Sequence, residues 1–331
     1  MSNPTVVFPE ANSVVLEERD RPEPAADEVL IETETSLVSP GTELTVLAGE
    51  YPNGSVWDEY AEYPFVPGYA NVGTVREAGA EADIASGTRV ATWTPHAAWV
   101  TAAADDCVPV PRGLSYDEGS LFAIAQIVMN GVRRGRVDWG ETVVVYGLGV
   151  LGQLCVRLCH LAGAETVVGV DLLQERIDHL PDVTGVFGVN ASERDPAEAV
   201  VTATGHPADV AFEVTGNPDA IPDEFDALRE QGRLVLLSSP HGETTLDFHD
   251  LVNAPSHEII GAHQLSHPTV ATATNPWTKE RHASLYFSYV QQSRLTVSSL
   301  FTHVADAADA PALYEELLAD RSESMAVRLE W

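Results

Sequence analysis

The spacing of apolar and polar positions changes twice along this chain. Residues 5–35 contain alternating, β-rich runs such as EVLIET at 28–33. Further strands are expected at Asn71–Val75, Arg89–Trp93 and Ala97–Thr101, with glycine and proline marking the turns around them. The first hundred residues are therefore expected to form a small, irregular β-barrel.

From Ser115 to Arg134 the apolar period becomes helical, with Ser115 in the position of an N-cap. Apolar strands and helical segments then alternate, which predicts a doubly wound parallel sheet. The strands expected in this part are Thr142–Tyr146, Thr166–Val170, Gly185–Val189, Val210–Val214, Leu234–Ser238 and Glu258–Gly261. A helix is expected at Asp219–Gln231.

After about residue 270 the pattern is helical again, at Lys279–Gln292 and Ala310–Asp320. The last expected strand, Met325–Trp331, is predicted to return to the first domain. A chain of 331 residues suits two domains. We expect residues 1–134 and 270–331 to form one domain, and residues 135–269 the other.

A glycine motif lies at the centre of the second domain. The strand at 142–146 is followed by Gly147, Gly149 and Gly152 in the spacing G-x-G-x-x-G, and then by a helical run at Gln153–Ala162. In such a loop the first glycine permits a tight turn, the second lets a pyrophosphate approach, and the third allows close packing. The helix N-terminus presents free N–H groups to the anion. We expect the loop Gly147, Leu148, Gly149, Val150, Leu151 and Gly152 to bind a dinucleotide.

Asp171 ends the next expected strand, 171 − 152 = 19 residues after the last glycine of the motif. A carboxylate at this spacing can accept hydrogen bonds from both hydroxyls of the adenosine ribose. It would disfavour a 2′-phosphate there, because like charges repel. The expected cofactor is therefore NAD, with NADP less favoured.

The net charge of the chain bears on the solvent and the partners that suit the protein. Asp and Glu number 50 against 18 Lys and Arg, a formal charge of −32, and Lys279 is the single lysine. The acids are dispersed, which favours a folded, halophilic protein whose self-repulsion is screened by concentrated salt. Such a charge argues against nucleic acids and anionic membranes as partners.

Targeting signals and cysteine usage point to the cytoplasm. The first residues show no charged and apolar leader pattern, and no run of about eighteen apolar residues suggests a membrane span. Cys107, Cys155 and Cys159 are few and odd in number, which fits a reduced compartment. Cys155 and Cys159 are expected to be small core residues of the helix after the glycine loop.

The chain resembles the medium-chain dehydrogenases/reductases over nearly its whole length. The matching pieces include PGYANVG at 67–73, GTRV at 87–90, the glycine loop, DVAFEVTG at 209–216 and GRLV at 232–235. The resemblance implies a GroES-like β-barrel catalytic domain followed by a Rossmann domain. It also implies an alcohol dehydrogenase or carbonyl reductase that commonly forms homodimers or homotetramers. SLVSPGTEL with YPFVPGYANVG looks most like the bacteriochlorophyllide dehydrogenase branch.

The zinc ligands of that family are not matched in this sequence. Ser39 lies near the place of the family's Cys, Tyr69 stands where its His would be, and Ala70 where a Glu would follow. Residues 121–132 contain no thiol or carboxylate, and residues 92–107 contain one cysteine where the structural zinc lobe needs four. Zinc needs thiolate, imidazole or carboxylate ligands. We therefore expect an enzyme without zinc.

Without zinc, a side chain must move the proton that accompanies hydride transfer. The residues from the family's substrate loops are Ser39, Glu43, Tyr69 and His96. Tyr69 can donate to a developing alkoxide, but would need a lowered pKa to act as a base. Glu43 can relay a proton or simply hydrogen-bond the 39–43 turn. His96 is either a relay near neutral pH or a surface residue at a strand end.

Further cofactor contacts are expected beyond the carboxyl ends of the sheet strands, from Thr215, Ser238 and His263. Arg176 resembles the family's arginine near the adenosine. Three functions stay open. The first is an NAD(H)-dependent oxidoreductase acting on a small alcohol or carbonyl compound. The others are a zinc-free quinone or enone reductase, and a non-catalytic nucleotide-binding relative.

Overall fold

The computed structural model describes residues 2–322 and 324–331 and divides the chain into two compact units. Unit 1 comprises residues 1–126 and 280–331, and unit 2 comprises residues 127–279. The first domain boundary, expected at 134/135, lies eight residues earlier, at 126/127, and the second, expected at 269/270, lies ten residues later, at 279/280. Unit 1 is thus built from two separate stretches of chain, whereas unit 2 is continuous.

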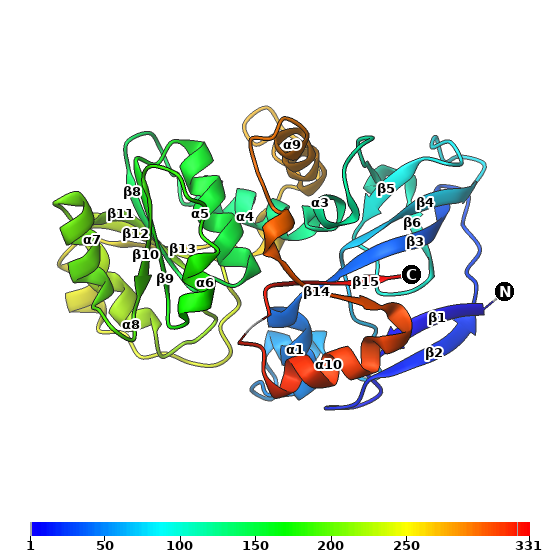
Figure 1. Ribbon diagram of the computed structural model, residues 1–331, viewed down its shortest axis with the longest axis horizontal. Coiled ribbons are helices and arrows are strands. Elements are labelled where there is room, and N and C mark those ends of the chain that lie inside the picture. Colours follow the sequence, from blue (N-terminus) through cyan, green and yellow to red (C-terminus); the bar gives the residue numbers. More distant parts are fainter. Residues whose placement is uncertain (1, 323) are drawn as a thin grey trace. The chain divides into compact units, whose positions relative to one another are not determined.

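Unit 1 is organised by the long strand β3 (Glu28–Val38), which has neighbours along both edges. On one edge it pairs with β4 (Asn71–Ala78). On the other edge it pairs first with β6 (Trp99–Ala103) and then with β15 (Ala326–Glu330). This confirms the predicted return of the last strand to the first domain (Figure 1). The expected strand at 28–33 is longer than predicted, because its buried apolar run continues to Val38.

The remaining elements of unit 1 extend or cover this sheet. Its strand order is β14-β15-β3-β4-β5-β7, and β1 and β2 form a separate ribbon. The other strands are β1 (Ser2–Val7), β2 (Val15–Asp20), β5 (Arg89–Thr92), β7 (Val108–Pro109) and β14 (Phe301–Asp306). The helices are α1 (Pro40–Ala48), α2 (Val56–Tyr60), α3 (Tyr116–Ser120), α9 (Lys279–Gln291) and α10 (Ala310–Ala319).

The helical run expected at 115–134 begins as predicted but is interrupted. The Ser115 hydroxyl accepts the N–H of Glu118, and the Glu118 side chain accepts the N–H of Ser115, forming a capping box. Leu121 then separates α3 from α4 (Phe122–Arg134). The sequence period alone did not show this break.

Unit 2 is a doubly wound parallel sheet with the strand order β10-β9-β8-β11-β12-β13. The strands are β8 (Thr142–Tyr146), β9 (Thr166–Asp171), β10 (Val186–Asn190), β11 (Ala208–Glu213), β12 (Leu228–Leu236) and β13 (Glu258–Gly261). Helices α5 (Val150–Ala162) and α6 (Gln174–Asp178) lie on one face, and α7 (Pro196–Thr204) and α8 (Ile221–Glu224) on the other (Figure 1). The predicted α/β fold class is confirmed.

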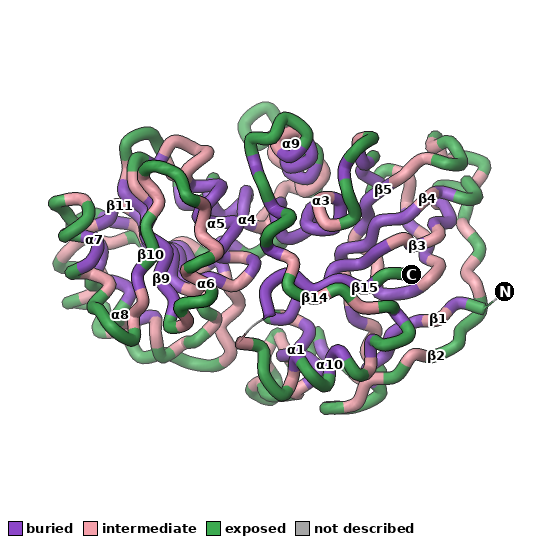
Figure 2. The backbone as a smooth tube through the Cα atoms, viewed as in Figure 1, coloured by how far each residue is buried: buried purple, intermediate pink, exposed green. Residues whose placement is uncertain are grey.

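The core of unit 2 explains its fully apolar strands. Every residue of β8 is buried, and the residues of β9 after Thr166 are buried as well (Figure 2). A strand covered by helices on both faces reads as a continuous apolar run rather than an alternating one. On the face of α7 and α8, Phe225, Ile221 and Val200 pack against the sheet.

The helix predicted at Asp219–Gln231 is wrong over its second half. Residues 221–227 are helical, but Leu228 pairs with Ala208 as the first residue of β12. Gln231 adopts φ +60°, a left-handed conformation that no continuing helix contains. The chain therefore turns into a strand about six residues before the strand expected at Leu234.

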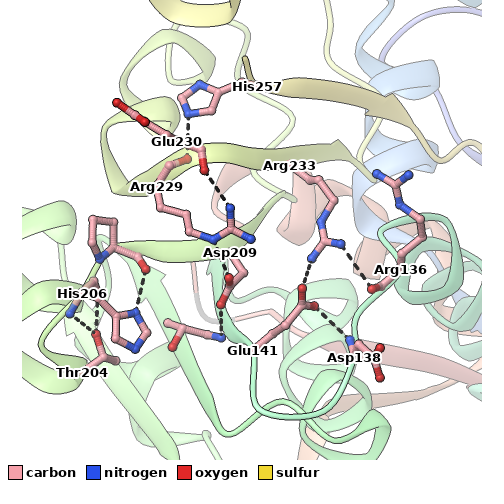
Figure 3. Close-up of polar contacts among 12 residues, drawn as sticks. Arg136, Asp138, Glu141, Thr204, His206, Asp209, Arg229, Glu230, Arg233 and His257 are labelled. Carbon is pink, nitrogen blue, oxygen red and sulfur yellow. Dashed lines mark hydrogen bonds and ion pairs between the residues drawn. The ribbon is translucent and has the colours of Figure 1, made fainter. Parts of the chain in front are cut away.

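Charged side chains join strands β8, β11 and β12 at the amino ends of the parallel sheet (Figure 3). Asp209 accepts the Arg229 Nε–H over 2.7 Å and the backbone N–H of Thr142 over 2.8 Å. Arg233 pairs with Glu141. Partly exposed pairs of this kind contribute about 0–1 kcal/mol each. They fix the strand ends opposite to the glycine loop, and the loop itself follows the carboxyl end of β8.

Within the described part of the chain, no helix is both long enough and apolar enough to cross a membrane. Cys107, Cys155 and Cys159 are free and buried, which confirms the core positions expected for Cys155 and Cys159.

Candidate functional site

The glycine loop of unit 2 follows β8, and its glycines meet three different local demands. Gly147 adopts φ +92°, and a Cβ there would lie 3.0 Å from the backbone of Val214 and Thr215. A Cβ on Gly152 would lie 1.8 Å from the Gly147 carbonyl oxygen, so this glycine packs the helix against the turn. A Cβ on Gly149 would meet no atom of the described chain within 4 Å. This is the open side on which a ligand can approach the backbone.

The helix after the loop begins earlier than the expected Gln153. Gly149 is the N-cap of α5, which therefore starts at Val150. The first N–H groups of a helix lack intrahelical acceptors and favour an anion. Leu148 is fully buried, while Val150 and Leu151 form the first turn. Gly163 ends the helix with φ 112°, as its place in the sequence indicated.

Asp171 ends β9 beside this loop, and its carboxylate is already engaged with the backbone. Oδ2 accepts the Leu148 N–H over 2.8 Å, and Oδ1 accepts the Leu173 N–H over 3.0 Å. Arg176 Nη1 lies 3.6 Å from Oδ2. Asp171 therefore shapes the glycine loop, a role that the sequence did not show. Each oxygen keeps a second lone pair with which it can accept a hydroxyl.

Glu213, at the end of β11, joins the loops that carry Thr215 and Ser238. Its Oε1 accepts the Thr215 hydroxyl and the Gly216 N–H, each over 2.8 Å, and its Oε2 accepts the Ser238 hydroxyl. Glu213 is fully buried. Sequence reasoning missed this positioning residue, although a carboxylate within the apolar run DVAFEV was a usable signal.

His263 follows β13, and its ring hydrogen-bonds within the turn that His263 itself begins. The ring Nδ1 accepts the Leu265 N–H over 3.3 Å and so caps a short 3₁₀ helix at Gln264–Ser266. His263 is exposed. No hydrogen bond within the described residues joins it to the glycine loop or to Asp171.

A second polar cluster lies in unit 1 and contains the four residues expected to carry chemistry. The Ser39 N–H donates to Glu43 Oε1 over 2.8 Å, and Glu43 Oε2 lies 3.1 Å from His96 Nε2. The Tyr69 hydroxyl donates to Ser39 Oγ over 2.7 Å. Ser39 is the N-cap of α1, Glu43 lies in the first turn, and His96 lies between β5 and β6. The cluster is a hydrogen-bonded unit rather than four separate side chains.

Three further residues complete this cluster, and the sequence did not identify them. The Tyr314 hydroxyl on α10 donates to Glu43 Oε2. Ser36 Oγ on β3 lies 2.7 Å from His96 Nδ1, and Trp331 Nε1 donates to Ser36 Oγ over 2.8 Å. These contacts span up to 295 positions in sequence, so no local pattern announces them.

The burial of His96 and Glu43 decides between the roles that the sequence left open for these two side chains. His96 is fully buried, so the alternative of a surface residue is wrong. Glu43 is 2% exposed, and it both closes the 39–43 turn and contacts His96. Ser36, His96 and Glu43 have the order of a nucleophilic triad, but Ser36 is fully buried and cannot reach a substrate.

The pKa of Tyr69 is raised to about 12, chiefly by burial, with the negative charge of Glu43 among the lesser causes. Burial and Glu43 also raise the pKa of Tyr314 well above its usual value. A phenol with such a pKa stays protonated at neutral pH. Tyr69 therefore carries its proton at neutral pH and is not available there as a base.

The cluster does not offer the donors of a zinc site. Across residues 2–322 and 324–331, no three His, Cys, Asp or Glu side chains are grouped so as to hold a metal ion. Near Ser39 the available zinc-type ligands are His96 and Glu43, which already bond each other. Hydroxyl groups complete the set, and structural or catalytic zinc takes thiolate, imidazole and carboxylate ligands instead.

Comparison with known proteins supports the same fold. The family model "zinc-binding dehydrogenase" matches residues 150–278. D-guloside 3-dehydrogenase of Escherichia coli K12 is 28% identical over 221 residues, which cover 65% of this chain and 61% of that protein. The chain therefore matches less than two thirds of the length of this relative.

Two solved structures align with the whole chain. A candidate zinc-binding dehydrogenase from Sinorhizobium meliloti 1021, solved bound to NADP, has a TM-score of 0.84 at 20% identity and covers 100% of both chains. A short chain alcohol dehydrogenase from E. coli CFT073, complexed with NADH, has a TM-score of 0.81 at 15% identity, again with 100% of both chains covered. At these identities the likeness is one of fold.

Proposed function

We propose that this chain is a zinc-independent oxidoreductase of the zinc-type alcohol dehydrogenase-like medium-chain superfamily and that it uses NAD(H). Its substrate would be a small alcohol or carbonyl compound. The observation that supports the proposal is the Tyr69–Ser39 and Glu43–His96 cluster, in which Tyr69 is a protonated phenol. In the sequence resemblance, Tyr69 stands where the superfamily's zinc enzymes have a histidine ligand.

The glycine loop fits a dinucleotide. Gly149 leaves open space beside the first N–H groups of α5, and Asp171 holds the backbone of Leu148 by a hydrogen bond. A bound nicotinamide would supply the hydride acceptor or donor. NADP and NADH occur in the two solved relatives described above, so the preference for NAD rests on the carboxylate of Asp171.

Tyr69 is proposed as the proton donor to the substrate oxygen during carbonyl reduction. As the hydride adds to the carbonyl carbon, the oxygen gains negative charge and takes the phenolic proton. In the free protein the phenol donates this proton to Ser39 Oγ, which orients it; during reduction the proton would turn to the substrate oxygen, and water would reprotonate the phenolate left behind. Glu43 and His96 hold the turn that carries Ser39. Because the pKa of Tyr69 is raised to about 12, its phenolate is scarce at neutral pH, so this role concerns carbonyl reduction rather than alcohol oxidation.

Turnover assays with alcohols, polyols, aldehydes, ketones and quinones test this proposal, with NADH and NADPH compared in concentrated salt. Tyr69→Phe should lower kcat by a factor of ~10²–10⁴, the usual contribution of a positioned acid. Tyr116→Phe, a half-exposed tyrosine of the same unit, should change it little. Equal loss in both variants would contradict the assignment. Turnover of quinones or enones alone would support the reductase alternative.

The absence of zinc needs a separate measurement. Elemental analysis of the purified protein should find no stoichiometric zinc, and chelators should leave turnover unchanged. About one zinc per chain, lost together with activity on chelation, would overturn this part of the proposal.

Binding of NADH without turnover of any substrate would support a non-catalytic nucleotide-binding protein. A homodimer or homotetramer and a place near the bacteriochlorophyllide dehydrogenase branch remain predictions.

A further inference from the structure

Gln153, the fourth residue of α5, hydrogen-bonds back to the glycine loop through its side chain. Its Nε2 donates to the Leu148 carbonyl oxygen over 3.3 Å and to the Arg176 carbonyl oxygen of α6 over 2.6 Å. Its backbone N–H donates to the Gly149 carbonyl oxygen over 2.9 Å. The side chain is fully buried. Gln153 therefore contacts two successive carbonyl groups of the loop and links them to α6.

The hydrogen bond to the Leu148 carbonyl fixes the direction of the next N–H group. A peptide group is planar and trans, so its N–H points opposite to its C=O. The Leu148 carbonyl and the Gly149 N–H belong to one peptide group, and the carbonyl faces the buried Gln153 side chain. The Gly149 N–H therefore points away from Gln153. Among the residues that the structure describes, no hydrogen bond uses this N–H, so it is available to a ligand.

The peptide group before Leu148 is held by a different side chain. The Leu148 N–H donates to Asp171 Oδ2 over 2.8 Å. The peptide groups on both sides of Leu148 are thus each bonded to a buried side chain, Asp171 on one side and Gln153 on the other. Two such bonds restrict the rotation of the backbone between them, so the loop holds one arrangement of its N–H groups.

Arg157, one turn further along α5, contacts the other end of the Gln153 carboxamide. Its Nη1 donates to Gln153 Oε1 over 2.7 Å, and its Nη2 donates to the His179 carbonyl oxygen over 2.8 Å. Burial lowers the pKa of this guanidinium to about 10, so it stays charged at neutral pH. A guanidinium can only donate, so the carboxamide presents its oxygen to Arg157 and its NH₂ group to the two carbonyls. The carboxamide is therefore held in one orientation from both ends.

We propose that Gln153 is a positioning residue that directs the Gly149 N–H toward the pyrophosphate of a bound dinucleotide. The inference rests on the proposed function and adds a residue outside the three glycines of the motif. N–H groups at a helix N-terminus bind anions of this kind. A peptide group that is already held loses less freedom on binding than a mobile one. Gln153 acts through the Leu148–Gly149 peptide and touches neither phosphate nor nicotinamide in this role.

NMR of the intact protein, labelled with ¹⁵N-glycine and kept in one concentrated salt solution, tests the proposal with ADP as the probe. The Gly149 signal is assigned by its loss in Gly149→Ala, which the φ of −64° and the open space at this position allow. In the unmutated protein, ADP should move the Gly149 amide proton downfield, because its N–H then donates to a phosphate oxygen. Gln153→Met removes the carboxamide from a side chain of similar length. It should abolish most of this shift and raise the Kd for ADP about tenfold.

Leu158→Ala is the control for a merely structural effect. Leu158 is buried on the same helix, and its truncation leaves a cavity that lowers stability while the hydrogen bonds of the loop remain. This variant should keep both the shift and the Kd of the unmutated protein. An unchanged Gly149 shift and Kd in folded Gln153→Met would overturn the proposal, and so would an equal loss in Leu158→Ala.

Gln153→Asn is the second variant in case Gln153→Met does not fold. It keeps a carboxamide but is one methylene shorter, so it cannot span from α5 to both carbonyls. It should show the same loss, and unaltered ADP binding and shift in folded Gln153→Asn would overturn the proposal.

The ADP measurement needs no turnover, so it separates this inference from the proposed function. If Tyr69→Phe keeps full activity, or if no substrate is turned over, the proposed function fails while the role of Gln153 is decided by ADP binding. Failure of the unmutated protein to bind ADP would overturn both.

Discussion

The backbone N–H of Leu148 donates to Oδ2 of Asp171 over 2.8 Å, so the carboxylate at the end of β9 holds the glycine loop at the end of β8. Asp171 is therefore part of the structure of the glycine loop itself. This changes how its substitution should be interpreted, because removing the carboxylate would affect both the shape of the loop and the charge that a bound ribose would meet.

We predict that the unmutated protein binds NADH at least about tenfold more tightly than NADPH, equivalent to ~1.4 kcal/mol. The reason is that a 2′-phosphate would meet the charge of Asp171, whereas a ribose hydroxyl can donate to it. Asp171→Asn keeps an acceptor for Leu148 but removes the charge, so the ratio should fall toward one. Binding titrations of NADH and NADPH at one fixed salt concentration measure the ratio of the two affinities.

The control for this prediction is Asp182→Asn, an equal charge change at an exposed position of unit 2. It should leave the ratio unaltered. NADPH binding as tightly as NADH to the unmutated protein would show that Asp171 does not select the cofactor.

Gly68 is predicted not to tolerate replacement by alanine, for two reasons. It adopts φ +101°, and a Cβ there would lie 2.7 Å from the His96 backbone nitrogen. Gly87 has a similar φ of +86° but no described atom within 4 Å of an added Cβ. Gly87→Ala should cost about 1–2 kcal/mol from backbone strain alone. Gly68→Ala should cost a further ~1–3 kcal/mol from overpacking and should lower turnover by displacing His96.

Denaturant unfolding of the two glycine variants, in the same concentrated salt, gives the comparison. Equal losses of stability would mean that the contact between Gly68 and His96 relaxes without cost, and the tight packing argument would then be wrong.

Glu224 is predicted to make the stability of unit 2 fall as pH rises. It is 1% exposed, and neither carboxylate oxygen has a hydrogen-bond partner among the described residues. Burial first, and then the charges of Glu213 and Asp223, raise its pKa from 4.5 to about 9. Below pH 4.5 both folded and unfolded chains carry the proton. Above it the unfolded chain loses the proton first, so stability declines until about pH 9.

The loss attributable to Glu224 should reach about 3 kcal/mol at pH 7, since each unit of separation is worth 1.36 kcal/mol. Glu224→Gln cannot ionise and should be more stable than the unmutated protein, by an amount that grows from pH 5 to pH 8. Glu243→Gln, at an exposed position, is the control. Melting curves across this range test the slope, and parallel curves for all three proteins would contradict the assignment.

Salt is predicted to stabilise the fold. The formal charge of −32 creates repulsion across the surface of the folded chain. At about 1 M salt the screening length falls to ~3 Å, which removes most of that repulsion. The melting temperature should therefore rise between low and molar potassium chloride. Equal melting temperatures at both concentrations would contradict the halophilic interpretation.

Local signals predicted the Rossmann half of the chain well. The strand Thr142–Tyr146 and the end of α5 at Gly163 were found because a continuous apolar run and a glycine C-cap are read directly from neighbouring residues. The helix predicted at Asp219–Gln231 is wrong from Leu228 onward, where long-range strand pairing outweighs the local helical pattern. Leu228 pairs with Ala208 across the sheet, and the turn at Gln231 is set by a backbone conformation that composition does not reveal.

The polar cluster of unit 1 shows a different limit of sequence-based prediction. Ser39, Glu43, Tyr69 and His96 could be proposed as a group from their places in loops, and the structure brings them together. Tyr314 could not be proposed, because it lies 271 positions from the carboxylate that it contacts. Its position on α10 looks like that of any core aromatic residue. Only the folded chain shows that its hydroxyl reaches Glu43.

The return of β15 to β3 has a consequence for synthesis on the ribosome. The half of β3 from Thr35 to Val38 pairs with β15, and residues 127–279 are made between these two strands. The continuous unit 2 can fold as it leaves the exit tunnel, whereas that edge of β3 waits for nearly three hundred residues of further translation. A nascent chain stalled before residue 326 would display an unpaired strand, and the Ser36 hydroxyl beside His96 would lack its Trp331 partner.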